Sequence, residues 1–315
     1  MAIRKVTLPS GTTKYEAVTD GPRDGTTGKR KQVRRRFDTR KQAVAWEASA
    51  KSEIDKGTFV VRERVTLDAY LDDWLGGLFK PKPSTVANYR DALKPVRRVI
   101  GAKMLQEIVK ADVERVVRGM QDGSLRVQGR RGEPMSPPAI RLTLTVLSMA
   151  LKGAVVEGRI ARNVAAMVER PADTRKRRDI WEAADAANFL VVADVDRLAG
   201  AWRLSLHGLR RGEVLGLAWA DVDLDQGLVH VHRSRVLVDG QPTLQASTKS
   251  DAGERMVPLD AGSVAAMRKT SAQQAQERLA AGSAYADTGL VAVDPLGRPV
   301  APRWYGDRFR AMAKL

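Results

Sequence analysis

The chain has 315 residues, enough for two or three domains with sizeable cores, and a formal net charge of +17. With 43% hydrophobic residues it is not a disordered basic protein, and the positive surplus points to a polyanionic partner, most simply nucleic acid. Cysteine is absent, which excludes disulfides, zinc fingers and iron–sulfur clusters. No apolar run approaches 18 residues and no signal-peptide core is present, so we expect no membrane contact and a cytoplasmic, nucleoid-associated protein.

Residues 1–62 hold 15 Lys/Arg against 7 Asp/Glu, a surplus of eight in a fifth of the chain. Their pattern predicts a small α+β domain, with strands over 12–18 and 33–37, turn residues over 20–25 and a helix over 38–56. Basic side chains crowd on and just before the second strand: Lys29, Arg30, Lys31, Arg34, Arg35 and Arg36. A charge run is most often a solvated face, but this density in so small a unit favours contact with a DNA backbone.

Residues 63–172 read as an all-helical domain. Ser84 caps one helix and Gly101 ends it, while Pro95 inside this helix should kink or split it. Ser136, followed by two prolines, opens a second helix. Both helices carry apolar stripes that repeat at spacings of three and four and are typical of a core: Val86, Tyr89, Leu93, Val96 and Ile100 in one, and Ile140, Leu144, Leu147, Leu151 and Val155 in the other.

Two connecting segments are rich in arginine. One is a loop over 122–135, a length typical of mobile or functional loops. The other links the helical domain to the rest of the chain and is suited to lying along a phosphate backbone. Its basic residues are Arg175, Lys176, Arg177 and Arg178.

Residues 173–315 predict a mixed α+β domain. A helical stretch over 179–211 places Leu198, Trp202, Leu206 and Leu209 on one side. Alternating residues over 227–259 indicate strands and a hairpin, and a helix returns over 263–281. A last helical pattern repeats one apolar residue per turn: Tyr305, Phe309, Met312 and Leu315.

One stretch of this third domain carries the candidate chemistry. A hydrophobic helix breaks at Gly208, and Arg210 then follows Leu209 in a segment that we expect to be buried. A buried arginine is costly unless it is paired or faces an anion, and Glu213 lies three residues on, on the same helical face. The residues alone leave two interpretations of equal weight: an internal Arg210–Glu213 pair, or an arginine held ready for a phosphate.

The block GLRRGE…GLAWADVD over 208–223, followed by a hairpin and by TKSDAGERMVPL over 248–259, strongly resembles the tyrosine recombinase (phage integrase) family. The resemblance implies an arm-type DNA-binding domain in 1–62, a core-binding domain of SAM-like helical fold in 63–172 and a catalytic domain of the DNA breaking-rejoining type in 173–315. It also implies that the partner is duplex DNA with arm and core attachment sites, on which the chain assembles as a homotetramer. A DNA-bending accessory protein is a possible further partner, and no cofactor is implied.

The resemblance assigns roles to three residues. Arg210 matches the arginine that binds a non-bridging oxygen of the scissile phosphate, Lys249 matches the hairpin lysine that protonates the departing 5′ oxygen, and Glu213 matches the acid that buttresses the arginine. The stretch from His207 also fits the second family motif, His-x-Leu-Arg-His, except at its last position. That alignment would place a lysine before the motif and a nucleophilic tyrosine soon after it, whereas Lys249 comes later and the next tyrosine is Tyr285. We therefore interpret His207 as a packed or surface residue.

The chain departs from the family beyond this point, because no second motif with a following tyrosine is found. Tyr305 lies on an apolar stripe, and we expect it in the core. The sequence thus predicts no nucleophile, a catalytic domain truncated at its C-terminus, and a chain that cannot cleave DNA. A non-catalytic DNA-binding regulator or competitor on the same scaffold is the rival interpretation. A type IB topoisomerase shares the chemistry, but the arm-like domain argues against it.

Metal signals are weak. His230 and His232 share one face of a strand, but two ligands without cysteine or a nearby glutamate make no metal site, so we expect solvent-facing histidines.

Overall fold

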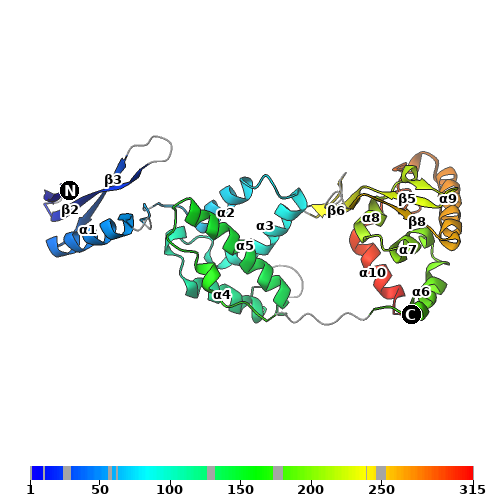
Figure 1. The fold of residues 1–315 in the computed structure, drawn as a ribbon, viewed down its shortest axis with the longest axis horizontal. Helices are drawn as coiled ribbons and strands as arrows, with labels where there is room; N and C mark the ends of the chain where they lie inside the picture. The colour runs from blue at the N-terminus through cyan, green and yellow to red at the C-terminus, as the bar shows by residue number, and fades with distance from the viewer. Residues whose placement is uncertain are drawn as a thin grey trace. The chain divides into compact units, whose positions relative to one another are not determined.

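The computed structural model describes residues 2–9, 11–23, 30–55, 59–61, 63–125, 132–172, 180–238, 240–245 and 253–314. Backbone contacts divide the chain into two units, Met1–Arg175 and Lys176–Leu315 (Figure 1). Several predicted site residues lie outside the described residues: Lys29, Arg175, Lys176, Arg177, Arg178 and Lys249. The side chains of Arg30 and Lys31 are likewise outside the description, although their backbone forms part of a strand.

The first unit begins with a three-stranded antiparallel sheet in the order β1-β2-β3, followed by one helix. The elements are β1 (Ala2–Thr7), β2 (Thr13–Arg23), β3 (Arg30–Phe37) and α1 (Arg40–Asp55). Helix α1 packs on the sheet face that carries Ala17 and Phe37, and the Phe37 and Trp46 rings lie 5.7 Å apart between centroids. Sequence patterning missed β1, and the expected turn residues Gly21 and Pro22 belong to β2.

The helical part of the first unit matches the all-helical expectation for this region. It contains α2 (Leu67–Gly76), α3 (Pro83–Ile100), η1 (Leu105–Glu107), α4 (Lys110–Gln121), α5 (Pro137–Val156) and η2 (Val164–Met167). Helix α3 runs through Pro95 without a break, so the expected split is wrong, and Lys82 rather than Ser84 is its N-cap. Proline deprives the helix of one hydrogen bond, but Leu93, Val96 and Ile100 are buried around it and hold both halves against the core.

Helix α5 is the centre of this core. An 18-residue window within it has a mean hydropathy of 1.6, which makes it the one helix in the described ranges that is long and apolar enough to cross a membrane. Its apolar face is nevertheless covered by neighbouring helices. The Tyr70 hydroxyl of α2 donates to the Ala150 carbonyl at 2.9 Å, and the Thr143 hydroxyl donates to the Ala92 carbonyl of α3 at the same distance. The hydropathy of α5 is thus accounted for by its burial in a protein core.

The second unit is a mixed α+β fold. It contains α6 (Ala183–Ala193), α7 (Ala199–Leu206), α8 (Arg211–Gly216), η3 (Trp219–Asp221), β4 (Val222–Asp223), β5 (Leu228–Val231), β6 (Ser234–Val238), β7 (Gln241–Gln245), β8 (Arg255–Pro258), α9 (Ala261–Ala281), η5 (Gly282–Ala284) and α10 (Pro302–Met312). Strands β4, β5 and β8 form one antiparallel sheet in that order, and β6 and β7 form a separate hairpin.

The helix expected over 179–211 is interrupted between α6 and α7. Asp196 turns the chain there, because its Oδ1 accepts both the Leu198 backbone N–H and the Trp202 indole N–H, each at 2.9 Å. This places Trp202 in the centre of the core, where its ring stacks on Tyr305 of α10 at 4.1 Å between centroids. The core therefore joins α7 to α10, and α8 adds the fully buried Val214 and Leu215 to it.

Candidate functional site

Arg210 stands at the point where the chain turns from α7 into α8. Gly208 has a φ of +81°, which a residue with a side chain rarely adopts, and Arg210 then takes the extended N-cap conformation. Glu213 accepts the Arg210 backbone N–H through Oε2 and its guanidinium Nη1 through Oε1, both at 2.8 Å. The Arg210 side chain is 75% exposed and Glu213 only 3%. The expectation of a buried Arg210 is therefore wrong: the cap conformation turns the arginine outward and buries the carboxylate that anchors it.

A second arginine holds the same carboxylate. Arg255, at the start of β8, donates Nη2 to Glu213 Oε2 at 2.8 Å and Nη1 to Oε1 at 3.3 Å. Burial raises the pKa of Glu213, but hydrogen bonds from Arg255 and Arg210 together outweigh it and hold the pKa below its usual 4.5. The carboxylate also raises the pKa of Arg255. Glu213 is thus an ionised, fully hydrogen-bonded anchor between α8 and β8.

Arg255 is a site residue that the sequence motifs did not single out, although the sequence contains a signal for it. In β8, Arg255 alternates with the buried Val257, so both residues point to the inner face of the sheet. A charged side chain at an inward strand position needs a partner, and Glu213 supplies it.

Two more arginines lie around α8 without a carboxylate partner among the described residues. Arg211 is exposed and lies across Gly306 of α10, while Arg235 of β6 donates Nη1 to the Val300 carbonyl at 2.8 Å. Burial lowers the pKa of Arg235. Strand β6 runs directly against α8 because that helix has Gly216 at the contact, where a Cβ would come within 2.9 Å of the Arg235 nitrogen. The surroundings of Arg210 thus carry a surplus of positive charge.

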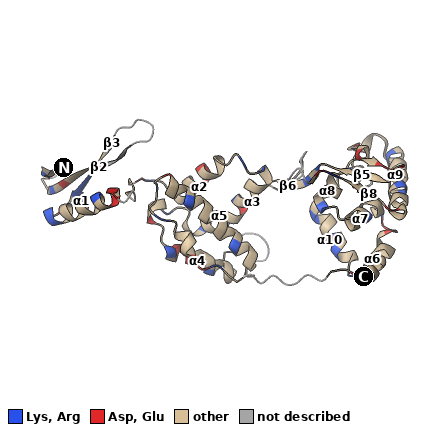
Figure 2. Cartoon of the chain, viewed as in Figure 1, with Lys and Arg blue, Asp and Glu red and all other residues tan. Residues whose placement is uncertain are grey.

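By strand alternation, the N-terminal sheet carries a second group of basic residues on the face away from α1; Figure 2 colours the Lys and Arg positions along the ribbon. The register aligns Arg4, Glu16 and Arg36 across the three strands, and paired residues of antiparallel strands point the same way. Glu16 is 3% exposed and accepts Arg4 Nε at 2.7 Å and Arg36 Nε at 3.0 Å, and these arginines hold its pKa below its usual value. By the same alternation, Arg34 shares this face.

The basic run of β3 is therefore divided between the two faces of the sheet. Arg35 follows the opposite alternation from Arg34 and Arg36, and its guanidinium carbon lies 5.4 Å from the centre of the Phe37 ring. All three side chains are exposed. The sequence indicated the density of charge correctly but not its distribution over two faces.

Tyr305 lies in the core, as its position on the apolar stripe predicted. It is 2% exposed, its hydroxyl donates to the Ala201 carbonyl at 2.8 Å, and it lies 2.9 Å from Ser205 Oγ. Burial raises the pKa of this phenol well above its usual value. A nucleophilic tyrosine must reach solvent and lose its proton, and this hydroxyl does neither.

The histidines serve local contacts. His207 Nε2 lies 2.8 Å from Ser263 Oγ and 3.0 Å from Asp260 Oδ2, which confirms the packed interpretation. His230 and His232 stack at 4.7 Å and are half-exposed, each facing a carboxylate, Glu254 and Asp221 respectively, so the expectation of solvent-facing rings holds only in part. Across the described ranges, no three His, Asp or Glu side chains are grouped as metal ligands.

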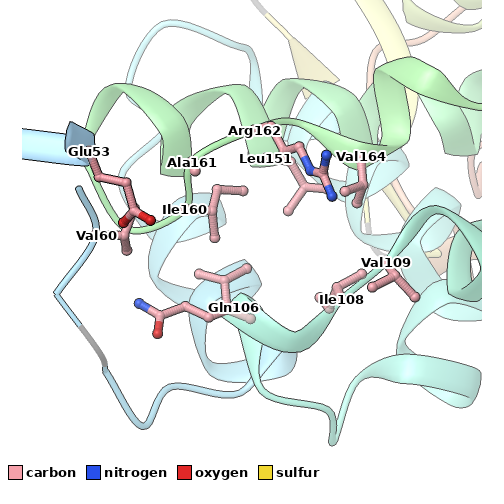
Figure 3. A pocket seen from close by; sticks show the side chains of 11 residues that line it. Glu53, Val60, Gln106, Ile108, Val109, Leu151, Ile160, Ala161, Arg162 and Val164 are labelled. Atoms are coloured by element: carbon pink, nitrogen blue, oxygen red, sulfur yellow. The ribbon is translucent and has the colours of Figure 1, made fainter. Parts of the chain in front are cut away.

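A hollow of about 500 Å³ lies in the first unit (Figure 3). Most of its lining residues are apolar, such as Ile108 and Leu151, and its polar members are Glu53, Gln106 and Arg162. None of its lining residues belongs to the second unit, so it is no part of the Arg210 site.

The chain is similar to known proteins in sequence and in fold. A family profile described as "Arm DNA-binding domain" matches residues 7–54. The ICEBs1 integrase of Bacillus subtilis (strain 168) is 25% identical over 222 residues, covering 69% of this chain and 58% of that protein. The tyrosine recombinase XerC of Xylella fastidiosa (strain 9a5c) is 32% identical over 165 residues, covering 49% of this chain and 55% of that protein.

The chain thus spans less than two thirds of the length of these two relatives. Among solved structures, a lambda integrase tetramer bound to a Holliday junction has the same fold, with a TM-score of 0.55 and 19% identity, covering 98% of this chain and 80% of that one. The arm-domain match, the two sequence relatives and the shared multidomain fold all support one family for this chain, the tyrosine recombinase (integrase) family.

Proposed function

We propose that this chain acts in site-specific DNA recombination and that its second unit binds the phosphate at which the DNA strand is exchanged. The observation that carries this proposal is the arrangement of Arg210, an exposed arginine anchored from behind by the buried carboxylate of Glu213. An internal pair would bury both partners, whereas here only the anion is buried. Because the Arg210 side chain is 75% exposed, the guanidinium donors that Glu213 does not use are open to solvent and available to a phosphate oxygen.

In the reaction we propose, a tyrosine hydroxyl releases its proton to solvent as its oxygen attacks the scissile phosphorus, and the bond from phosphorus to the 5′ oxygen breaks. A 3′-phosphotyrosyl bond forms, and Lys249 gives the departing 5′ oxygen its proton. Arg210 stabilises the charge that develops on the non-bridging oxygens. The energy of the phosphodiester is kept in the protein–DNA bond, so the strand can be rejoined without a cofactor.

The rest of the chain serves DNA binding in this proposal. Residues 1–62 form the arm-type domain, 63–172 the core-binding domain and 173–315 the catalytic domain. The basic linker, Arg175 to Arg178, contacts the phosphate backbone of the DNA. The open face of the N-terminal sheet supports the first assignment, because Arg34 and Arg36 project from it. Four copies would assemble on paired attachment sites of the nucleoid, as the lambda integrase tetramer assembles on its junction.

A second function is favoured by the state of the tyrosines. The chain has five, and the hydroxyls of Tyr70 and Tyr305 are bonded to core carbonyls. We therefore propose that neither of these two is the nucleophile, and the alternative function is that of a regulator or competitor that occupies the sites without cutting them.

One experiment separates these functions. Duplexes bound by the chain are selected from a random pool, and the selected core site is then offered with a nick next to the scissile phosphate, so that a cleaved strand cannot be rejoined. Site-specific binding without a denaturation-resistant adduct supports the regulator. An adduct lost on one Tyr→Phe substitution supports the enzyme. Binding without any sequence preference contradicts both.

A further inference from the structure

We propose that Arg255 is a positioning residue for Arg210: by holding Glu213 from the side of the sheet, it keeps Arg210 free to bind a DNA phosphate. The inference rests on the proposed function of Arg210 and deepens it. Arg255 touches no DNA in this scheme and acts only through the carboxylate that it shares with Arg210.

The first support is the division of the carboxylate between two arginines. Glu213 accepts Arg210 Nη1 through Oε1 only, while Arg255 reaches both oxygens, at 2.8 and 3.3 Å. Without Arg255, both carboxylate oxygens would be available to the Arg210 guanidinium, and a bidentate pair would be the strongest arrangement. Arg210 would then turn inward, and fewer of its donors would face solvent.

The second support is charge. Two arginines and one glutamate carry a net positive charge of one, whereas Arg210 and Glu213 alone would be neutral. The exposed fractions of the two arginines agree with this division, because the Arg210 side chain is 75% exposed and the Arg255 side chain only 30%. Arg255 thus neutralises the buried carboxylate from within, and the charge of Arg210 remains available to an anion outside.

The third support is the place of Arg255 in the chain. It begins β8, pairs with Val231 of β5, and its Nη1 also donates to the Gly253 carbonyl at 3.1 Å. Lys249 stands six residues earlier in the sequence. Arg255 therefore ties the first residue of β8 to the carboxylate that anchors Arg210.

The test measures how strongly the protein prefers a charged phosphate to a neutral one. In the selected core duplex, each phosphate in turn is replaced by an uncharged methylphosphonate, and the ratio of the two Kd values is recorded for the 315-residue chain. We expect one phosphate to give a ratio of about 10 or more, as a charge-assisted hydrogen bond does. R210Q should bring that ratio close to one.

Variants at Arg255 then test the inference. R255Q removes the charge and should lower the ratio to within about twofold of that of R210Q. R255K keeps the charge but cannot reach both carboxylate oxygens, so its ratio should lie between those of R255Q and the unmodified chain. The matched control is R233Q. Arg233 is a similarly half-buried arginine on a carboxylate that is 11% exposed, that of Asp221, but no exposed arginine shares that carboxylate in the described part of the chain. R233Q should leave the ratio unchanged.

The outcomes separate the inference from the proposed function. If no phosphate gives a ratio above one, or if R210Q keeps it, the role of Arg210 fails. If R210Q loses the ratio while R255Q or R255K keeps the full value, the role of Arg255 fails alone. A purely structural Arg255 would lower the melting temperature and weaken both duplexes equally, which also overturns the inference. Should R255Q not fold, R255K carries the test.

Discussion

Removing one oxygen atom from Tyr305 tests whether this residue is structural or catalytic. In Tyr305→Phe the ring still stacks on Trp202, but the bond to the Ala201 carbonyl and the contact with Ser205 Oγ are lost. A buried hydrogen bond contributes about 0.5–1.5 kcal/mol, so the substitution should cost about 1–2 kcal/mol of unfolding free energy. For a unit of about 140 residues this corresponds to a melting point lower by roughly 3–6 °C.

Scanning calorimetry measures the shift, and gel mobility measures DNA binding, which should be unchanged. Tyr305→Ala removes the whole ring and serves as the reference. It should lower the free energy of unfolding by about 3–5 kcal/mol, as replacement of a buried Phe or Trp by Ala does. The reasoning is refuted if Tyr305→Phe melts like the unmodified chain and at the same time abolishes a covalent adduct on the nicked duplex, because the hydroxyl would then serve chemistry and not packing.

Three further outcomes are expected. Arg34→Ala should weaken duplex binding and lower the slope of log K against log salt by about one, while the control Lys51→Ala on α1 should change neither, as titrations at several salt concentrations would show. Because the pKa values of Glu213 and Asp221 are held below their usual 4.5 and 3.8, their stabilisation is complete above the unfolded values and is lost as pH falls through the lower folded ones. The melting temperature should therefore change little with pH above about pH 5 and fall below it, and Glu213→Gln should remove part of that fall. Gly216→Ala should destabilise the second unit, because a Cβ would come within 2.9 Å of the Arg235 nitrogen; an unchanged melting point would contradict that packing.

The sequence predicted elements well where local periodicity and burial agree, as in α5 and α9. It failed where tertiary contacts decide. Pro95 reads as a helix breaker, yet buried neighbours on both sides keep α3 continuous. The helical periodicity over 179–211 hides the turn at Asp196, which depends on a hydrogen bond from Trp202 six residues later. Segment 2–7 becomes strand β1 because it pairs with β2, and no pattern within the segment itself predicts that pairing.

The candidate site shows the same limit. The spacing of Arg210 and Glu213 was enough to predict their pairing, because residues three apart meet on a helix. It was not enough to predict which partner is buried, since that depends on the extended cap at Arg210. Arg255 comes from 42 residues away, and only strand alternation hinted at its role. Long-range contacts of this kind require the fold.

The order of the helices has a consequence for how the chain is made. Helix α5 is apolar enough to resemble a membrane span, yet it is the last of the four long core helices of the first unit in the sequence. During synthesis α2, α3 and α4 leave the ribosome before it, so the surfaces that cover α5 exist when its apolar residues emerge. A rearranged gene that encoded α5 first would expose those 20 residues to chaperones, to aggregation or to the membrane-targeting machinery before any partner could shield them.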